Sequence, residues 1–235
     1  MIETVSVLIL ASIHLFAQKL KFIHYKPRSA YLSFAGGVSV AYVFIHLLPE
    51  LLEAQKFLEE DLLDSVKFLE SHAFLIALTG LTVFYGLERL AKIHKKEDRR
   101  SSPNLYRIHV ASFAVYNFVI GYGILHRENM SEKSLAFYTT AMALHFLVND
   151  FGLYNLFKER YLKSGRWILS LSILLGFAAG ILIEVSEGVL IILISFISGG
   201  IILNILKEEL PEEKESKFSA FVIGTTIYTV LLLAV

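Results

Sequence analysis

Residues 189–206 read VLIILISFISGGIILNIL, an apolar stretch without a single charged side chain. A transmembrane helix needs about 20 mostly apolar residues to cross the hydrocarbon layer, so this stretch has the composition and length of a span. Similar apolar runs occur at 4–17, 31–52, 73–90, 109–125, 135–157, 167–183 and 218–235. Because the runs end at charged or turn-forming residues, the sequence predicts eight transmembrane helices.

The composition places the chain among membrane proteins. Its 235 residues are 55% hydrophobic and only 19% charged, and the mean hydropathy is +0.58. A soluble domain of this size cannot bury so much apolar surface. The absence of cysteine excludes disulfides, thiolate metal sites and cysteine nucleophiles, and a net charge of zero without a long basic tract predicts no nucleic-acid partner. We expect one all-α domain, 1–235, that forms a polytopic helix bundle in the lipid bilayer.

The basic residues predict the orientation of this bundle, since Lys and Arg near span ends favour the cytoplasmic side. If the N-terminus lies outside, the outer side holds only Lys56, Lys67, Arg127 and Lys133 of the 22 basic residues. We therefore predict that both termini lie outside, with the plasma membrane as the expected location. No basic flank precedes the first apolar run, so we interpret that run as a retained helix and not as a cleaved signal.

Small residues recur inside three of the expected spans. They are Gly36-Gly37, the pair Gly176 and Gly180, and Gly199-Gly200. Small side chains let the backbones of two membrane helices approach closely, so these positions predict tight helix packing. The spacing says nothing about substrate.

Polar residues at membrane depth usually face the bundle interior or a water-filled path, because lipid exposure is costly. The fourth span carries Tyr116 and Asn117, and the fifth carries His145, Asn149 and Asp150. Imidazole, amide and carboxylate groups all ligate divalent cations, so Asn117, His145, Asn149 and Asp150 are candidate metal ligands. The alternative is hydrogen bonding between helices, which needs no ligand.

The second span ends with a further pair of candidate ligands. His46 and Glu50 are one helical turn apart near the outer surface, where an ion would enter. An interfacial ion pair or a helix-end cap explains the pair equally well. The remaining histidines, including His14 and His109, lie near span ends, and we expect them to be ordinary interfacial side chains.

Two longer stretches resemble the ZIP family of divalent-metal transporters. Residues 32–50, LSFAGGVSVAYVFIHLLPE, look like the second span of that family, with its GG and HLLPE elements. Residues 199–213, GGIILNILKEELPEE, are similar to its seventh span. With the number and order of the spans, the resemblance covers nearly the whole chain and implies a ZIP-like bundle.

The resemblance also implies a central metal site on the fourth and fifth spans, where the family has patterns of the form HNxxDG and HExPHE. This chain has YNFVIG at 116–121 and HFLVND at 145–150, so Asn117, Gly121 and His145 match and Asp150 replaces a glutamate. Tyr116, Ile120, Phe146, Val148 and Asn149 depart from the pattern. The carboxylates missing at Ile120 and Phe146 would neutralise a dication in low dielectric, so we expect weaker zinc binding than the family's site provides.

The expected function is transport of a divalent metal ion, such as zinc, iron or manganese, by an elevator or rocking motion of one helix group against another. The metal is then a transported substrate, no tightly bound cofactor is expected, and the protein is not an enzyme. The alternative is a ZIP-like protein that no longer transports and instead binds a partner or senses a ligand. An intramembrane metal hydrolase is disfavoured because no His-x-x-x-His pair occurs inside a span. The resemblance leaves a homodimer open.

Overall fold

The chain folds as an assembly of helices. The computed structural model describes residues 1–19, 30–61, 73–97, 103–126, 131–209 and 217–234, and no strand occurs among them. The helices are α1 (Ile2–Phe16), α2 (Ala30–Tyr42), α3 (Leu48–Asp61), α5 (Ala73–Glu97), α6 (Pro103–Gly123), α7 (Glu132–Phe157), α8 (Arg166–Leu182), α9 (Glu187–Asn204) and α10 (Phe218–Leu233). Three π-turns extend them: Val43–Leu47 joins α2 to α3, Tyr161–Gly165 leads into α8, and Ile205–Glu209 continues α9.

Each apolar run of the sequence coincides with a helix in this structure. Within the described ranges, four helical stretches are long and apolar enough to cross a membrane: Ala30–Leu58, Ala73–Leu90, Tyr161–Leu182 and Glu187–Lys207. The shorter apolar helices are Ile2–Phe16 and Phe218–Leu233. The all-helical fold is therefore confirmed, whereas the count of eight spans stays a prediction. Residues 210–213 of the ZIP-like motif and residue 235 lie outside the described residues.

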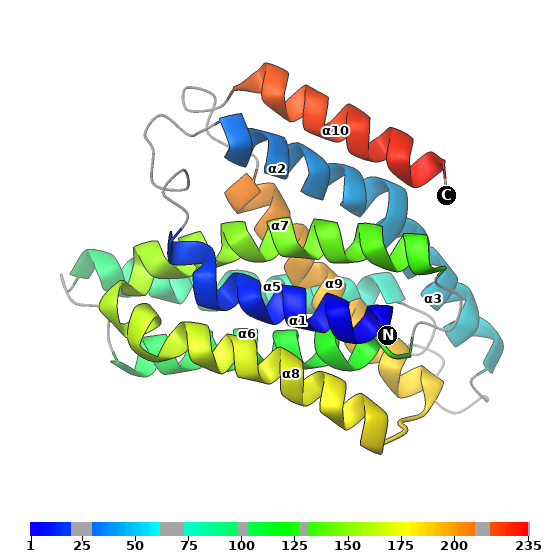
Figure 1. The fold of residues 1–235 in the computed structure, drawn as a ribbon. Helices are drawn as coiled ribbons and strands as arrows, with labels where there is room; N and C mark the ends of the chain where they lie inside the picture. The colour runs from blue at the N-terminus through cyan, green and yellow to red at the C-terminus, as the bar shows by residue number, and fades with distance from the viewer. Residues whose placement is uncertain (20–29, 62–72, 98–102, 127–130, 210–216, 235) are drawn as a thin grey trace.

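The surface of the bundle is rich in large apolar side chains. Leu8, Leu175, Ile181 and Val230 are among those that are more than half exposed. Exposed apolar surface on this scale indicates a membrane-embedded protein. The chain ends at α1 and α10 lie at the same end of the bundle, where the connection between α8 and α9 also lies (Figure 1).

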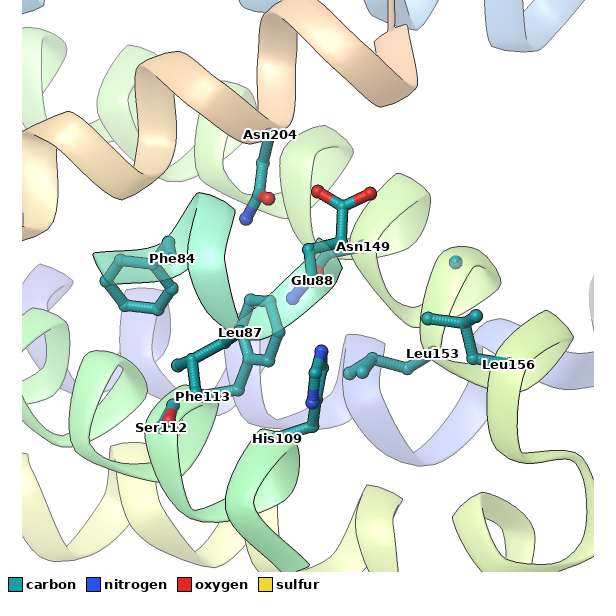
Figure 2. A pocket seen from close by; sticks show the side chains of 11 residues that line it. Phe84, Leu87, Glu88, His109, Ser112, Phe113, Asn149, Leu153, Leu156 and Asn204 are labelled. Carbon is teal, nitrogen blue, oxygen red and sulfur yellow. The ribbon is translucent and has the colours of Figure 1, made fainter. Parts of the chain in front are cut away.

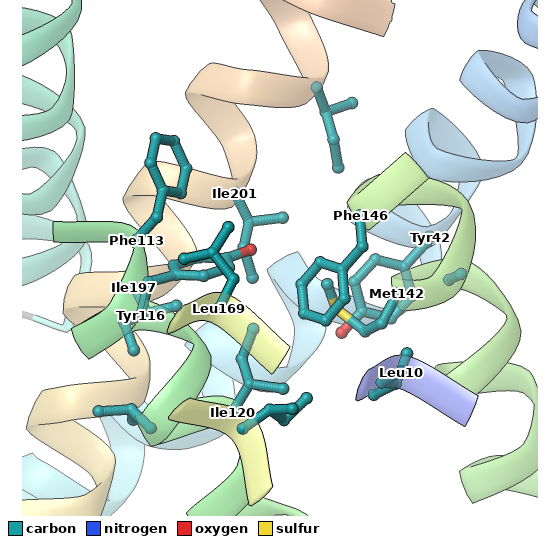
Figure 3. Packing of buried hydrophobic residues seen from close by; sticks show 14 of the residues in the cluster. Leu10, Tyr42, Phe113, Tyr116, Ile120, Met142, Phe146, Leu169, Ile197 and Ile201 are labelled. Carbon is teal, nitrogen blue, oxygen red and sulfur yellow. The ribbon is translucent and has the colours of Figure 1, made fainter. Parts of the chain in front are cut away.

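Helix α7 lies at the centre of the packing. It buries side chains around most of its circumference, including Met142, Phe146 and Leu153. Its neighbours contribute Leu10 from α1 and Tyr42 from α2 to the same apolar core (Figure 3). A helix surrounded in this way can present polar side chains only to other helices, so any polar group on its middle turns must find a partner inside the protein.

Three helix pairs pack backbone against backbone through reciprocal glycines. A Cβ atom on Gly176 of α8 would overlap the carbonyl oxygen of Phe118, and one on Gly121 of α6 would overlap that of Ile173. The same exchange joins α5 to α9 through Gly80 and Gly199, and α2 to α10 through Gly37 and Gly224. The close packing predicted at Gly37, Gly176 and Gly199 is thereby confirmed.

Candidate functional site

Four polar side chains meet in the core of the bundle. His14 Nδ1 lies 3.0 Å from Asp150 Oδ1, and His14 Nε2 lies 2.8 Å from Asn117 Oδ1. Tyr161 donates its phenolic O–H to Asp150 Oδ1 at 2.5 Å. His14, Asn117 and Asp150 each expose 0% of their surface. These residues, which we call the His14 cluster, come from α1, α6, α7 and the π-turn before α8.

The periodicity of α1 explains the position of His14. Val7, Leu10, Ala11 and His14 are all buried, and their spacing of three to four residues places them on one face of the helix. That face packs against α7 and α8. His14 therefore continues an apolar stripe into the core.

A tight turn after α7 brings Tyr161 back onto Asp150. Lys158 ends α7 with a φ of 45° and a ψ of −117°, and its N–H donates to the carbonyl of Tyr154 at 2.7 Å. A positive φ is uncommon for a residue with a side chain and is maintained only where the surrounding structure requires it. Here the conformation of Lys158 reverses the chain within a few residues. Tyr161 of the π-turn can then donate a hydrogen bond to the carboxylate of Asp150 on α7.

Hydrogen-bond accounting limits where the protons of the His14 cluster can lie. Asn117 Nδ2 donates to the carbonyl of Phe113 at 2.8 Å, so its Oδ1 must be the atom that faces His14. An amide oxygen only accepts, and Nε2 of His14 must therefore carry a proton. The contact between His14 Nδ1 and Asp150 then needs a second proton, held by one of the two groups. The His14–Asp150 pair is thus neutral overall, either as an ion pair or as imidazole beside carboxylic acid.

Apolar side chains enclose the His14 cluster. The ring of Phe146 stacks on His14 with a centroid separation of 4.6 Å. Phe146 and Ile120, the two positions where the ZIP pattern has carboxylates, are both buried in the hydrophobic core (Figure 3). The imidazole and the carboxylate are fully buried and therefore interact in a medium of low dielectric, where their mutual attraction is strong.

The structure gives the four candidate ligands on α6 and α7 different contacts. Asn117 and Asp150 meet in the His14 cluster, but His145 Nε2 lies 3.0 Å from the Tyr116 hydroxyl, and Asn149 lines a separate cavity. Within the described part of the chain, no three His, Cys, Asp or Glu side chains lie close enough together to hold a metal ion by themselves. That Asn117, His145, Asn149 and Asp150 together form a metal site stays a prediction.

His46 and Glu50 lie at a different place in the bundle. His46 belongs to the π-turn Val43–Leu47, and its ring lies 5.4 Å from that of Tyr42. It lines a cavity between α2, α7 and α10 together with Tyr42, Ser134, Phe137, Tyr138 and Leu232. Glu50 follows in the first turn of α3 and is half-buried. Their role at the entrance of an ion path stays a prediction.

Sequence reasoning missed two members of the His14 cluster. His14 was expected at an interface, and this expectation is wrong because the side chain is buried. The signal that would have found it is the spacing of Val7, Leu10 and Ala11, which continues to position 14. Tyr161 had no such signal, since it reaches Asp150 only through the turn at Lys158.

Comparison of the chain with models of protein families, with curated proteins and with solved structures finds no match. The resemblance to the ZIP family therefore rests on the two motif stretches and the order of the helices. It stays a prediction.

Proposed function

We propose that this protein carries a divalent metal cation across a membrane and that His14, Asn117 and Asp150 lie on its path. The observation that carries the proposal is a buried imidazole, amide oxygen and carboxylate, contributed by three helices and joined within 3.0 Å. All three are metal-ligand types. Ionisable groups inside a membrane protein are costly to keep and typically mark an ion path.

A cation at this position would replace protons. The neutral His14–Asp150 pair holds a proton between its partners, and a metal ion binds imidazole only at a nitrogen that has lost its proton. The carboxylate then supplies negative charge in the low-dielectric core, while Asn117 supplies a neutral oxygen. A single carboxylate favours a weakly bound, exchangeable ion over a tightly held one.

The packing supports a motion of one helix group against another. The His14 cluster draws only on α1, α6, α7 and the π-turn that leads into α8. Glycine contacts join α6 to α8, α2 to α10 and α5 to α9. In the proposed cycle the first group carries the ion while the glycine-joined pairs α2–α10 and α5–α9 serve as the frame.

A second candidate is a transport-inactive ZIP-like protein that binds a partner or senses a ligand. One observation favours it: both ring nitrogens of His14 already have partners, and Phe146 occupies the face of the ring. In that case the His14 cluster is a structural hydrogen-bond network that stabilises the core.

Uptake by liposomes tests the proposal. Purified protein is reconstituted around a metal-sensitive dye, and uptake of zinc, cadmium, manganese and iron(II) is followed for wild type, His14→Ala, Asp150→Asn and His145→Ala. Saturable uptake that His14→Ala and Asp150→Asn reduce at least tenfold supports transport through the cluster. The control is His126→Ala, since His126 follows the end of α6 and its Nε2 lies 3.2 Å from the Gly180 carbonyl, outside the cluster. Equal fluxes in wild type, variants and empty liposomes, with folded protein, would contradict metal transport and favour the transport-inactive alternative.

A further inference from the structure

A cavity of about 40 Å³ lies between α5, α6, α7 and α9 (Figure 2). Phe84 and Phe113 line it from α5 and α6, and Asn149 and Asn204 line it from α7 and α9. We call it the Asn149 cavity. One water molecule needs about 10–15 Å³ measured in this way, so the cavity has room for more than one.

Two amide groups at this cavity are buried with their N–H donors unused. Asn149 is 7% exposed and Asn204 is 9% exposed, and the Nδ2 atom of each finds no hydrogen-bond partner among the described residues. Figure 2 shows both side chains directed toward the same space. Because a buried N–H group needs an acceptor, the two amides fit a ligand whose oxygen accepts hydrogen bonds.

The charges at the Asn149 cavity are balanced, which favours an uncharged ligand. The carboxylate of Glu88 lines the cavity and forms an ion pair with the ammonium group of Lys207. His109 lines it too and has a hydrogen bond with the backbone of Leu105. Water carries no charge and both accepts and donates hydrogen bonds, so water suits this set of side chains.

The Glu88–Lys207 pair connects the Asn149 cavity with the surface of the protein. The side chain of Lys207 is 27% exposed and that of Glu88 is 15% exposed. A lysine at the end of an apolar helix extends its ammonium group toward water. Helix α9 begins at the end of the bundle where both chain ends lie, and Lys207 follows it at the opposite end (Figure 1). In the predicted orientation this second end is cytoplasmic.

Tyr116 and His145 separate the Asn149 cavity from a smaller one. The Tyr116 hydroxyl lies 3.0 Å from His145 Nε2. On one side, the ring of Tyr116 lies 6.1 Å from those of Phe84 and Phe113, which line the Asn149 cavity. On the other side, apolar side chains such as Ile120 surround a cavity of about 20 Å³, and an apolar cavity of this kind stays dry.

The two cavities and the Tyr116–His145 pair follow one face of each helix. His145 lies one turn before Asn149 on α7, and residues three or four apart share a helix face. The same spacing relates the lining residues of the two neighbouring helices. These are Phe113, Tyr116 and Ile120 on α6, and Ile197, Ile201 and Asn204 on α9.

We propose that α5, α6, α7 and α9 enclose a water-filled half-channel that leads from the Lys207 end of the bundle to the Tyr116–His145 pair, and that this pair closes it toward the apolar cavity. The half-channel goes beyond the proposed cation transport, because it needs no metal ion. Asn149 precedes Asp150 on α7, and consecutive helical residues project about 100° apart, so the half-channel and the His14 cluster use different faces of that helix. Water and other small uncharged solutes that form hydrogen bonds thereby reach the interior of the bundle from one side.

Radiolytic footprinting tests whether the Asn149 cavity holds water. X-rays turn bound water into hydroxyl radicals, which oxidise the nearest side chains, and mass spectrometry measures the oxidation. The full-length protein in detergent should be oxidised at Phe84 and Phe113, although these are only 7% and 8% exposed. Met142 is the internal control, because methionine oxidises readily and this side chain is 0% exposed in the apolar core. It should stay unmodified.

Replacing the two amide donors should dry the cavity. In the double variant Asn149→Leu, Asn204→Leu, oxidation of Phe84 and Phe113 should fall at least fivefold, while Met142 stays unmodified and thereby shows that the core is intact. If wild-type Phe84 and Phe113 are oxidised no more than Met142, or if the double variant leaves their oxidation unchanged, the water-filled half-channel is wrong. No metal is present in these measurements, so their result is independent of the uptake assay.

Tyr116→Ala tests the closure. Without the ring, water should pass into the apolar cavity, and oxidation of Ile120 and Ile197, each 5% exposed, should rise at least fivefold. Val115→Ala is the matched control, since Val115 is the neighbouring residue on α6 and is 63% exposed at the surface of the bundle. It should leave both values as in wild type. Unchanged oxidation of Ile120 and Ile197 in Tyr116→Ala would overturn the assigned role of the Tyr116–His145 pair.

Discussion

Asp150 is the residue on which the His14 cluster depends, since it shares a hydrogen bond with His14 and accepts one from Tyr161. A buried carboxylate keeps its position only if its oxygens are satisfied. Tyr161 follows the turn at Lys158 and donates a short hydrogen bond to Asp150. The orientation of Asp150 therefore depends on two separate segments of the chain, α1 with His14 and the π-turn with Tyr161.

Tyr161→Phe should therefore destabilise the protein. Removing the hydroxyl leaves Asp150 with one donor fewer in a buried position, which costs about 1–3 kcal/mol. Thermal unfolding in detergent should show a lower midpoint than wild type. The control is Tyr85→Phe on α5, whose ring is 47% exposed and which should change stability by less than about 0.5 kcal/mol. Equal midpoints for the two variants would show that the bond from Tyr161 contributes little.

Phe146→Glu should raise the affinity of the His14 cluster for zinc. Phe146 stacks on the His14 ring, where a carboxylate would add the charge that a dication needs in low dielectric. We expect at least tenfold tighter zinc binding by equilibrium dialysis, together with lower stability, because an uncompensated buried charge is costly. Leu144→Glu, which adds the same charge at a partly buried position of α7, should leave zinc affinity unchanged. If both variants bind zinc as weakly as wild type, the cluster is not a metal site.

At the scale of elements, glycine pairs decide which helices stay together. The pairs α2–α10, α5–α9 and α6–α8 approach so closely that a side chain at the contact would overlap a backbone carbonyl. Because lipid gives no hydrophobic driving force between helices, such contacts rely on close van der Waals packing. These pairs are the units most suited to move as rigid bodies.

Gly176→Val should separate α8 from α6. The new side chain would meet the backbone of Phe118, which has no room to yield, so we expect loss of several kcal/mol or failure to fold. Gly86→Ala is the matched change, since a Cβ at Gly86 meets nothing within 4 Å. It should be neutral or stabilising by about 0.5–1 kcal/mol, because alanine favours helix more than glycine does. Yield and unfolding midpoint in detergent distinguish the two, and similar values would contradict the packing argument.

At the scale of the whole molecule, the charge pattern predicts which end of the bundle faces outward. The loop between α8 and α9 contains the exposed Ser186, and the turn after α7 contains the exposed Glu159. With both termini outside, Ser186 faces the exterior and Glu159 the cytoplasm.

Cysteine labelling checks this orientation without background, because the natural chain has no cysteine. In intact cells a membrane-impermeant maleimide should label Ser186→Cys, and it should label Glu159→Cys only after permeabilisation. The opposite labelling pattern would show that the bundle has the reverse orientation in the membrane. Labelling of both sites in intact cells would contradict the assignment of an odd number of spans between them.

The sequence by itself determined the helical class, the helix positions, the membrane character and the close approach at Gly37, Gly176 and Gly199. These depend on hydropathy and side-chain size along one segment, which are local properties. It also picked out Asn117 and Asp150, because polar residues within apolar helices are few and costly. The ZIP-like site it suggested on α6 and α7 stays untested.

Only the tertiary structure decided which polar groups meet. His14 lies 136 residues from Asp150 and 103 from Asn117 along the chain, and Tyr161 reaches Asp150 through an unusual turn. Adjacent Asn149 and Asp150 have different surroundings: Asn149 lines a cavity with residues of α5, α6 and α9, whereas Asp150 meets His14 of α1 and Tyr161 of the π-turn. Such partnerships depend on how helices pack against one another, and packing is set by the shapes of many side chains together, which no single segment of sequence encodes.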